Sequence, residues 1–192
     1  MCIRDRFLRA GDEPVYIGFG SMVSGDMGEL AEIIRQAVKL SGVRAVVALG
    51  WGQQEAKTKD ANIFYVKSVP HDWLFPHMAG AVHHGGAGTT ATSLRHALPT
   101  LVVPFGGDQP FWAERVYAAG CGPKAIPRDK LTAENLAEGL RALISNPEYT
   151  RNAACIGEAL RNEHGCANAA DLIEKAVWDW ENGNPAQDGM NI

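Results

Sequence analysis

The chain has 192 residues, which is enough for one large domain with its own buried core. Hydrophobic residues make up 46% and charged residues 21%, a composition that excludes disordered and collagen-like chains. The 18 basic and 22 acidic residues give a net charge of −4 and form no basic stripe, which argues against nucleic-acid binding.

Apolar, β-rich runs follow one another along the chain, with amphipathic segments between them. We expect strands at residues 15–19, 45–49, 63–66, 80–84 and 100–103, and a weaker one at 124–126. Helices are expected at residues 27–40, 89–97, 110–119, 132–145, 148–164 and 167–180. Because strands alternate with helices, the sequence predicts an α/β fold, a doubly wound, Rossmann-like parallel sheet of about six strands with C-terminal helices.

The domain limits follow from the same pattern. Residues 1–13 are charged and lack a hydrophobic period, so we interpret them as a leader or as the start of a fragment. Residues 14–182 form the expected domain with its C-terminal helices, and residues 183–192 are expected to be a flexible tail. The four Cys residues form no CxxC pair, which indicates reduced thiols and no zinc site.

The sequence contains no membrane or export signal that we can identify. No apolar run reaches the roughly 20 residues of a membrane span, and the N-terminus lacks the long apolar segment of a signal peptide. We therefore expect a cytoplasmic protein with, at most, peripheral membrane contact.

The loops that follow the strands are the first places to look for a binding site. In doubly wound sheets ligands bind beyond the carboxyl ends of the strands, because loops and helix N-termini converge there. The first such loop is Gly18-Phe19-Gly20-Ser21, in which the glycines allow close backbone approach and Ser21 offers a hydroxyl. A plain turn explains this loop equally well.

The segment HHGGAGTT, residues 83–90, leads from a strand end into a helix start. Gly85, Gly86 and Gly88 leave backbone N–H groups uncovered by side chains, an arrangement that binds a diphosphate. Thr89 and Thr90 can donate hydroxyls or cap the helix. The segment is neither a P-loop nor GxGxxG, and the alternative is a tight turn with an ordinary threonine cap.

The two adjacent histidines of this segment are expected to have different roles. His83 and His84 point to opposite faces of a strand, so they cannot easily share an ion, and we expect no metal site. One ring is expected to pack inside the domain, while the other donates a hydrogen bond to a phosphate oxygen.

Two further loops offer groups that suit a sugar and a base. In the loop PFGGDQP, residues 104–110, Asp108 accepts hydrogen bonds and Gln109 both donates and accepts them, which suits sugar hydroxyls. The alternative is that Asp108 caps the following helix. Residues 69–75 offer exposed backbone to a base, and Trp51 is a candidate stacking surface, although a lone Trp is more often core or rim packing.

The stretch VPHDWLFPHMAGAVHHGGAGTTATSLRHALPTLVVPFGGDQPFWAERV, residues 69–116, contains three of these loops in order. It resembles the donor-site signature of UDP-glycosyltransferases of the GT-B type. It is most similar to the sterol 3-β-glucosyltransferases and their bacterial relatives that glycosylate lipids, flavonoids or antibiotics. GFGS and GWG extend the resemblance to the first strand. The resemblance implies the C-terminal half of a GT-B fold, a UDP-sugar as donor substrate, and no cofactor.

The resemblance also implies a role for each loop. In chain order it implies Ser21 at the phosphates, the Val69 main chain at the uracil, His71 near the ribose, His84 at the β-phosphate, Gly88, Thr89 and Thr90 at the diphosphate, and Asp108 and Gln109 at the hexose. Plant members carry an acidic ribose contact where this chain has Thr92, and a Trp where it has Ser68, so details transfer poorly from them. In the family, the catalytic base and the acceptor site come from an N-terminal domain, so we expect no catalytic residue here.

We therefore expect the donor domain of an inverting hexosyltransferase that uses a UDP-hexose, foremost UDP-glucose, and modifies a sterol or another small hydrophobic alcohol. Its partner would be an N-terminal acceptor-binding domain, without which the chain would be inactive. One alternative is a non-catalytic nucleotide-sugar-binding module that needs a partner chain. Another is a different GT-B enzyme, such as an N-acetylglucosaminyltransferase or an epimerase. A dehydrogenase-like domain would need GxGxxG and a following acidic residue, which the sequence lacks.

Overall fold

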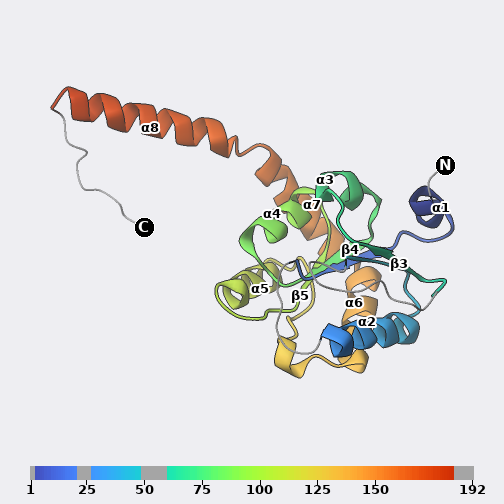
Figure 1. Ribbon diagram of the computed structural model, residues 1–192. Coiled ribbons are helices and arrows are strands. Elements are labelled where there is room, and N and C mark those ends of the chain that lie inside the picture. The colour runs from blue at the N-terminus through green and yellow to red at the C-terminus, as the bar shows by residue number, and fades with distance from the viewer. Residues whose placement is uncertain (1–2, 21–26, 49–59, 184–192) are drawn as a thin grey trace. The chain divides into compact units, whose positions relative to one another are not determined.

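The computed structural model describes residues 3–20, 27–48 and 60–183. The chain divides into two compact units, Met1–Leu160 and Arg161–Ile192. The first unit contains a five-stranded parallel sheet with helices on both faces (Figure 1). This arrangement confirms the predicted doubly wound α/β class.

The order of the strands places three carboxyl ends next to one another. The sheet consists of β1 (Val15–Gly18), β2 (Ala45–Ala48), β3 (Ile63–Val66), β4 (Gly80–His83) and β5 (Thr100–Val102), in the order β3-β2-β1-β4-β5. Gly18 at the end of β1 is level with Ala48 of β2 and His83 of β4. Both β1 and β4 are buried along their whole length, as expected for strands covered on two faces.

The weak sixth strand expected at residues 124–126 is not a regular strand. The segment still follows the edge of β5, since the Ile126 N–H donates to the Val102 carbonyl at 3.1 Å. Pro123 and Pro127 flank the segment, and neither has the N–H group that a continuous ladder requires. The extended chain is therefore present next to β5, but its pairing is interrupted.

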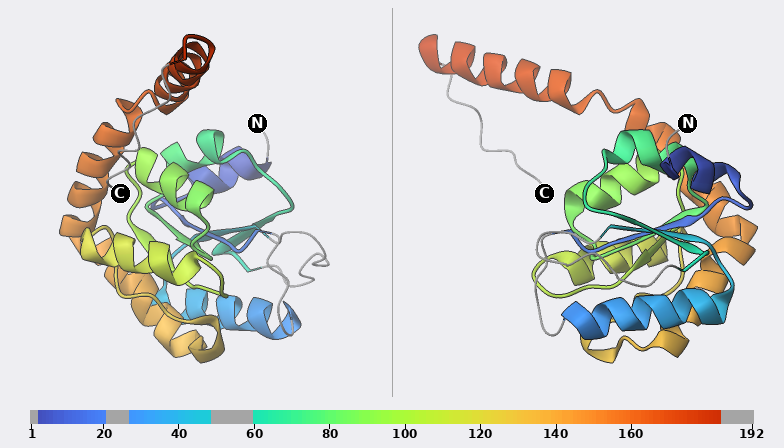
Figure 2. Two further views of the ribbon diagram at one scale, coloured as in Figure 1. Left: turned by 90° about the vertical axis from the view of Figure 1, so that its left-hand side faces the viewer. Right: turned by 45° about the vertical axis from the view of Figure 1, so that its right-hand side comes forward.

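Helices α2 (Met27–Ser41) and α6 (Ala133–Ser145) cover one face of the sheet and pack against each other (Figure 2). Their buried side chains recur at helical spacing and comprise Leu30, Ile34, Ala37 and Val38 of α2 and Leu136, Ala137, Leu140 and Leu143 of α6. A capping box begins α6: the Thr132 hydroxyl accepts from the Asn135 N–H, and the Asn135 side chain accepts from the Thr132 N–H.

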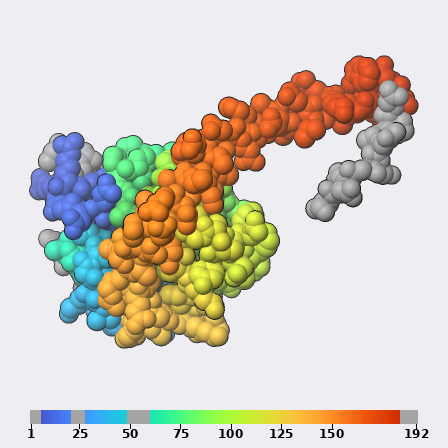
Figure 3. Space-filling model, turned by 180° about the vertical axis from the view of Figure 1, so that it is seen from behind, coloured from blue at the N-terminus to red at the C-terminus, as the bar shows by residue number. Residues whose placement is uncertain are grey.

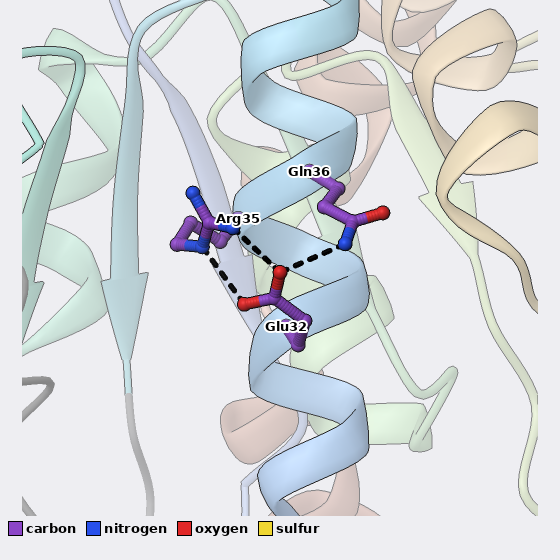
Figure 4. Close-up of polar contacts among 3 residues, drawn as sticks. All are labelled: Glu32, Arg35 and Gln36. Carbon is purple, nitrogen blue, oxygen red and sulfur yellow. Dashed lines mark hydrogen bonds and ion pairs between the residues drawn. The ribbon is translucent and has the colours of Figure 1, made fainter.

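The outer face of α2 is polar, as its amphipathic pattern predicts. Arg35 donates to both carboxylate oxygens of Glu32, at 2.8 and 2.5 Å, and Gln36 donates to the same carboxylate at 2.8 Å (Figure 4). Hydrogen bonds from Arg35 and Gln36 lower the pKa of Glu32 to about 2. Because the group is exposed, this network fixes the solvent side of the helix and adds little to stability.

The opposite face of the sheet carries a second apolar cluster. Its buried members are Tyr16, Val46, Leu74, Phe75, Met78, Ala81 and Leu98; Leu74 belongs to α3 (His71–Leu74) and Phe75 to the short 3-10 turn η1 (Phe75–His77). Helix α1 (Ile3–Arg9) also packs here through Phe7, whose ring stacks on Phe64 at 5.5 Å and lies 4.3 Å from the Arg44 guanidinium. The expected leader thus includes a helix, and the expected loop at 69–75 is partly helical.

A third cluster lies beside β5, between α4 (Ala87–Arg95), α5 (Gln109–Ala118) and α7 (Pro147–Arg161). Its buried members include Leu94, Val116 and Ala153, one from each helix. The space-filling view shows α6 and α7 on the rear surface of this unit (Figure 3). A second 3-10 turn, η2 (Arg128–Lys130), precedes α6.

The second unit consists, within its described residues, of the end of α7 and α8 (Gly165–Glu181). Its large apolar side chains are exposed and comprise Leu172, Ile173, Val177, Trp178 and Trp180. None of the helices in the described residues is long and apolar enough to span a membrane. The tail expected at 183–192 falls outside the described part of the chain from residue 184 onward.

Candidate functional site

The sheet has a topological switch point between β1 and β4. From β1 the chain leads to α2 on one face, whereas from β4 it leads to α4 beside the other, and a ligand-binding crevice is expected at such a point. Gly20, after β1, and His84, after β4, meet there: a β-carbon at Gly20 would lie 3.5 Å from His84 Cε1. The crevice is thus framed by two of the loops that the sequence singled out.

The glycines after β4 are required by close packing around His84. Gly85 has a φ of +89°, and a β-carbon there would lie 2.6 Å from Val102 Cγ1. A β-carbon at Gly86 would lie 2.6 Å from His84 Nε2. Any larger residue at either position would therefore displace the turn or the histidine ring.

The N-terminus of α4 presents backbone N–H groups to the crevice. Gly86 is the N-cap residue, no side chain caps the helix, and the first intrahelical bond runs from the Thr90 N–H to the Gly86 carbonyl at 2.9 Å. The N–H groups of Ala87, Gly88 and Thr89 precede that bond and have no partner within the helix. Such groups, with the positive end of the helix dipole, form an anion site.

This geometry changes two details of the prediction. The helix begins at Ala87 and not at residue 89, which adds the Ala87 N–H to the predicted set. The Thr90 hydroxyl donates to the Gly86 carbonyl at 3.0 Å, and the residue is buried, so both donors of Thr90 serve the helix itself. Thr89, in contrast, is only partly buried and does not cap the helix, so its hydroxyl is the better candidate for a ligand contact.

His83 and His84 have the contrasting environments that the strand pattern predicts. His83 is fully buried, and its Nδ1 accepts a hydrogen bond from the Gly85 N–H at 3.0 Å. Burial, together with His84 and His71, lowers the pKa of His83 to about 3, so the ring is neutral. Half-buried His84 has its pKa lowered by burial, an effect that the Asp108 carboxylate opposes.

Asp108 and Gln109 play different structural parts in the loop after β5. The Gln109 side chain is buried, and its carbonyl oxygen accepts from the N–H groups of Phe105 and Gly106, at 2.7 and 3.2 Å. The alternative that Asp108 caps α5 through its side chain is wrong, because that side chain makes no cap bond. The exposed Asp108 carboxylate instead accepts from Trp112 Nε1 at 2.8 Å.

The loop after β3 supplies Val69 and His71. The His71 ring stacks on Phe75, with centroids 4.5 Å apart, and its Nε2 lies 3.1 Å from the Tyr16 hydroxyl. Burial lowers the pKa of His71, so this ring is also held neutral and oriented. In the described part of the chain no hydrogen bond engages the Val69 main chain, which is where a base was expected to pair.

The structure brings most of the predicted residues to one edge of the sheet. His84, Gly86, Gly88, Thr89, Thr90, Asp108 and Gln109 surround the ends of β4 and β5, and Val69 and His71 follow β3. Ser21 and Trp51 lie outside the described residues. No group of three or more His, Cys, Asp or Glu side chains in the described ranges could hold a metal ion.

Sequence reasoning named Gly20 but not its contact with His84, and it did not single out Trp112. Gly20 had a visible signal, since glycine after a strand marks close backbone approach, whereas its contact with His84 depends on the strand order. Trp112 follows Asp108 by four residues, the spacing at which helical side chains meet, so this pair could have been found in the sequence.

Comparison with known proteins agrees with this geometry. Residues 31–173 match the family model described as "Erythromycin biosynthesis protein CIII-like, C-terminal domain". The sterol 3-beta-glucosyltransferase UGT80B1 of Arabidopsis thaliana is 43% identical over 177 residues, covering 90% of this chain. The chain spans 29% of the length of that relative.

Two solved structures share the fold. The glycotransferase of kitacinnamycin superposes with a TM-score of 0.71 at 26% identity, covering 86% of this chain and 44% of that protein. The calicheamicin glycosyltransferase CalG4 superposes with a TM-score of 0.75 at 19% identity, covering 88% of this chain and 44% of that protein. The match therefore spans less than half of each larger protein.

Proposed function

Because the chain belongs to the family of erythromycin biosynthesis protein CIII-like C-terminal domains, we propose that it is the sugar-donor domain of a glycosyltransferase and binds a UDP-hexose, foremost UDP-glucose. The observation that carries the proposal is the unpaired N-terminus of α4 beside His84, at the switch point of the sheet. The loops after β1, β3, β4 and β5 contain the groups that suit phosphate, base and hexose. All four loops begin at the carboxyl edge of the sheet, where this anion site also lies.

The diphosphate would lie on the first turn of α4. The N–H groups of Ala87, Gly88 and Thr89 would donate to phosphate oxygens, and His84 would donate from its ring. His84 is neutral before binding, and an arriving diphosphate raises the pKa of a nearby histidine. The same donors would stabilise the charge that develops on the leaving UDP during transfer.

The remaining parts of the donor would extend to either side of the diphosphate. The hexose would lie toward Asp108, whose carboxylate is exposed and electrostatically coupled to His84. The uracil would pair with the Val69 main chain, and the ribose would lie near His71, which Tyr16 and Phe75 hold in place. Ser21 and Trp51 would complete the site from the loops after β1 and β2.

The acceptor side of the reaction belongs to a larger protein in this proposal. The relatives named as sterol 3-beta-glucosyltransferases favour a sterol or a similar hydrophobic alcohol as acceptor. Since the chain spans 29% and 26% of two of these relatives, we propose an N-terminal acceptor-binding domain that supplies the base for inverting transfer.

Calorimetric titration of the chain with UDP, UDP-glucose, UDP-galactose, UDP-GlcNAc, NAD and ATP tests the donor assignment. We expect UDP and the UDP-hexoses to bind in preference to NAD and ATP, because the crevice has a diphosphate site and lacks the GxGxxG and acidic residue of dinucleotide domains. Tighter binding of NAD than of UDP would contradict the proposal.

A further inference from the structure

The geometry points to Trp112 as a positioning residue of the donor site. Its indole N–H holds one carboxylate oxygen of Asp108, so that the other oxygen is directed to the hexose of the donor. The assignment rests on the proposed function and deepens it, because it names the residue that fixes the orientation of the hexose contact.

The pairing is set by the first turn of α5. Trp112 Nε1 donates to Asp108 Oδ2 at 2.8 Å, and the Trp112 backbone N–H also donates to the Asp108 carbonyl, at 3.3 Å. The two residues are therefore joined twice, once through the backbone and once through their side chains. A hydrogen bond to a carboxylate is stronger than one between neutral groups, so the bond from Trp112 favours one orientation of the Asp108 side chain.

The indole ring has one aromatic neighbour and borders an apolar cavity. Trp112 is partly buried and meets the Phe111 ring edge to face, with centroids 5.1 Å apart. It also forms part of the wall of an apolar cavity of about 620 Å³ between α4, α5 and α7, together with Leu94, Val116 and Leu160. The indole N–H is the one polar group of this side chain, and its partner in the structure is the Asp108 carboxylate.

The backbone on the other side of Asp108 is also held. Gln109 accepts from the N–H groups of Phe105 and Gly106, which closes the loop into a small ring of hydrogen bonds. The main freedom left to Asp108 is rotation of its own exposed side chain, and the bond from Trp112 removes it. A side chain that is ordered before binding loses less conformational entropy when the ligand arrives.

A ligand-specific loss of affinity tests this role. We would titrate the parent chain and Trp112→Phe with UDP and with UDP-glucose, since phenylalanine keeps an aromatic ring but lacks the N–H donor. We expect UDP-glucose affinity to fall about 5- to 10-fold, the effect of one lost hydrogen bond, while UDP affinity stays within about twofold. Tyr117→Phe is the matched control, because it also removes a polar hydrogen from an aromatic ring on α5 and should change neither affinity.

A double-mutant comparison separates positioning from general packing. Once Asp108→Ala has removed the acceptor of the Trp112 indole N–H, adding Trp112→Phe should cost UDP-glucose affinity little further, because the two side chains act as one unit. Full additivity would overturn the assignment, as would equal losses for UDP and UDP-glucose. A parent chain that bound neither ligand would overturn the proposed function itself, and this assignment with it.

The NMR signal of the Trp112 indole N–H, compared between the parent and the surface variant Asp108→Ala, tests the pair even if Trp112→Phe fails to fold. The indole N–H resonance of Trp112 should shift and lose protection from solvent exchange in Asp108→Ala, since its acceptor is gone. An unchanged indole resonance in Asp108→Ala would show that the pair is not formed in solution and would overturn the assignment.

Discussion

At the scale of single residues, His83 and His84 show how one residue type takes two roles in adjacent positions. His83 is the last residue of β4, fully buried, and bonded through Nδ1 to the Gly85 N–H. His84 is beyond the strand, half-buried, and surrounded by Gly20, Gly86 and the charge of Asp108. The pleat of the strand gives the buried His83 and the half-buried His84 different environments, and the proposed phosphate contact falls to His84.

We predict that His84→Ala weakens UDP binding by roughly 10- to 150-fold, because a charge-assisted hydrogen bond worth about 1.5–3 kcal/mol is lost. His83→Asn is the matched control: its side-chain oxygen can accept from the Gly85 N–H, so UDP affinity should change little. Isothermal titration with UDP measures both. Equal UDP affinity for His84→Ala and the parent would refute the assignment of the phosphate contact.

A second prediction concerns the pH dependence of stability. Burial lowers the pKa of His83 from 6.5 to about 3, so in the unfolded chain the ring binds a proton that the folded protein excludes. Stability should therefore be intact above about pH 6.5 and should fall with decreasing pH, by up to about 1.4 kcal/mol per pH unit.

Comparison with His83→Asn isolates this effect. Urea unfolding at about pH 7.5 and about pH 5 should show a loss of about 2 kcal/mol in the parent beyond the loss in the variant. His71 and His84, whose pKa values are also lowered, are present in both proteins and cancel. The same pH dependence in both proteins would show that His83 does not resist protonation.

At the scale of elements, the first turn of α4 combines features that weaken a helix and favour a ligand. No side chain caps it, and Gly88 occupies its exposed surface with no atom within 4 Å of an added β-carbon. Glycine in a helix costs about 0.5–1 kcal/mol relative to alanine, and nothing within the described fold requires it there. Close approach of a phosphate is a physical reason for its presence.

We therefore predict that Gly88→Ala has opposite effects on folding and on binding. The free energy of unfolding should increase by up to about 1 kcal/mol, which raises the melting temperature. UDP affinity should fall, because the new methyl group would occupy the proposed phosphate position. Thermal denaturation and titration with UDP measure the two effects. Ala91→Gly, one turn further along α4, changes helix propensity in the opposite direction and should leave UDP affinity unchanged; unchanged affinity in Gly88→Ala would argue against a ligand at this turn.

At the scale of the whole molecule, the proposed function makes the carboxyl edge of the sheet one wall of a cleft that an acceptor domain would complete. Each of the polar side chains at the switch point has a task in the proposal: His84 contacts the phosphate, Asp108 the hexose, and His71 is held by Tyr16 beside the ribose. Transfer to an alcohol also requires a base within roughly 2.6–3.2 Å of the attacking hydroxyl and a wall that excludes water. These would come from the acceptor domain.

We predict that the 192-residue chain folds and binds UDP-glucose but does not transfer glucose appreciably to sterols or phenols. Addition of a matching N-terminal domain should restore transfer, because it supplies the base and the acceptor wall. Mass spectrometry of reaction mixtures detects the glucoside. Multiple-turnover product from the chain alone would reveal a base within it and overturn the division of labour.

Local patterns in the sequence determined the class of the fold and the segments that form the site. Apolar runs of four or five residues gave β1 to β5 to within two residues, and the spacing of Leu30, Ile34 and Val38 gave α2, because these signals depend only on neighbouring residues. Glycines at strand ends indicated the loops in which a ligand is proposed to bind. The motif HHGGAGTT predicted a strand end followed by a helix start, which the structure confirms, and with it a diphosphate site that remains a prediction.

Contacts between distant segments decided the rest. Helix α1 packs through Phe7 on Phe64 and Arg44, which are distant in the sequence. The order of the strands, which no local pattern encodes, places Gly20 next to His84. The polar groups of Thr90 and Gln109 suited a ligand in the sequence, yet the fold directs the Thr90 hydroxyl and the Gln109 carbonyl to neighbouring backbone. A sequence specifies which groups can donate or accept, whereas the tertiary structure decides which of them already have a partner, because each buried polar group must be satisfied where it lies.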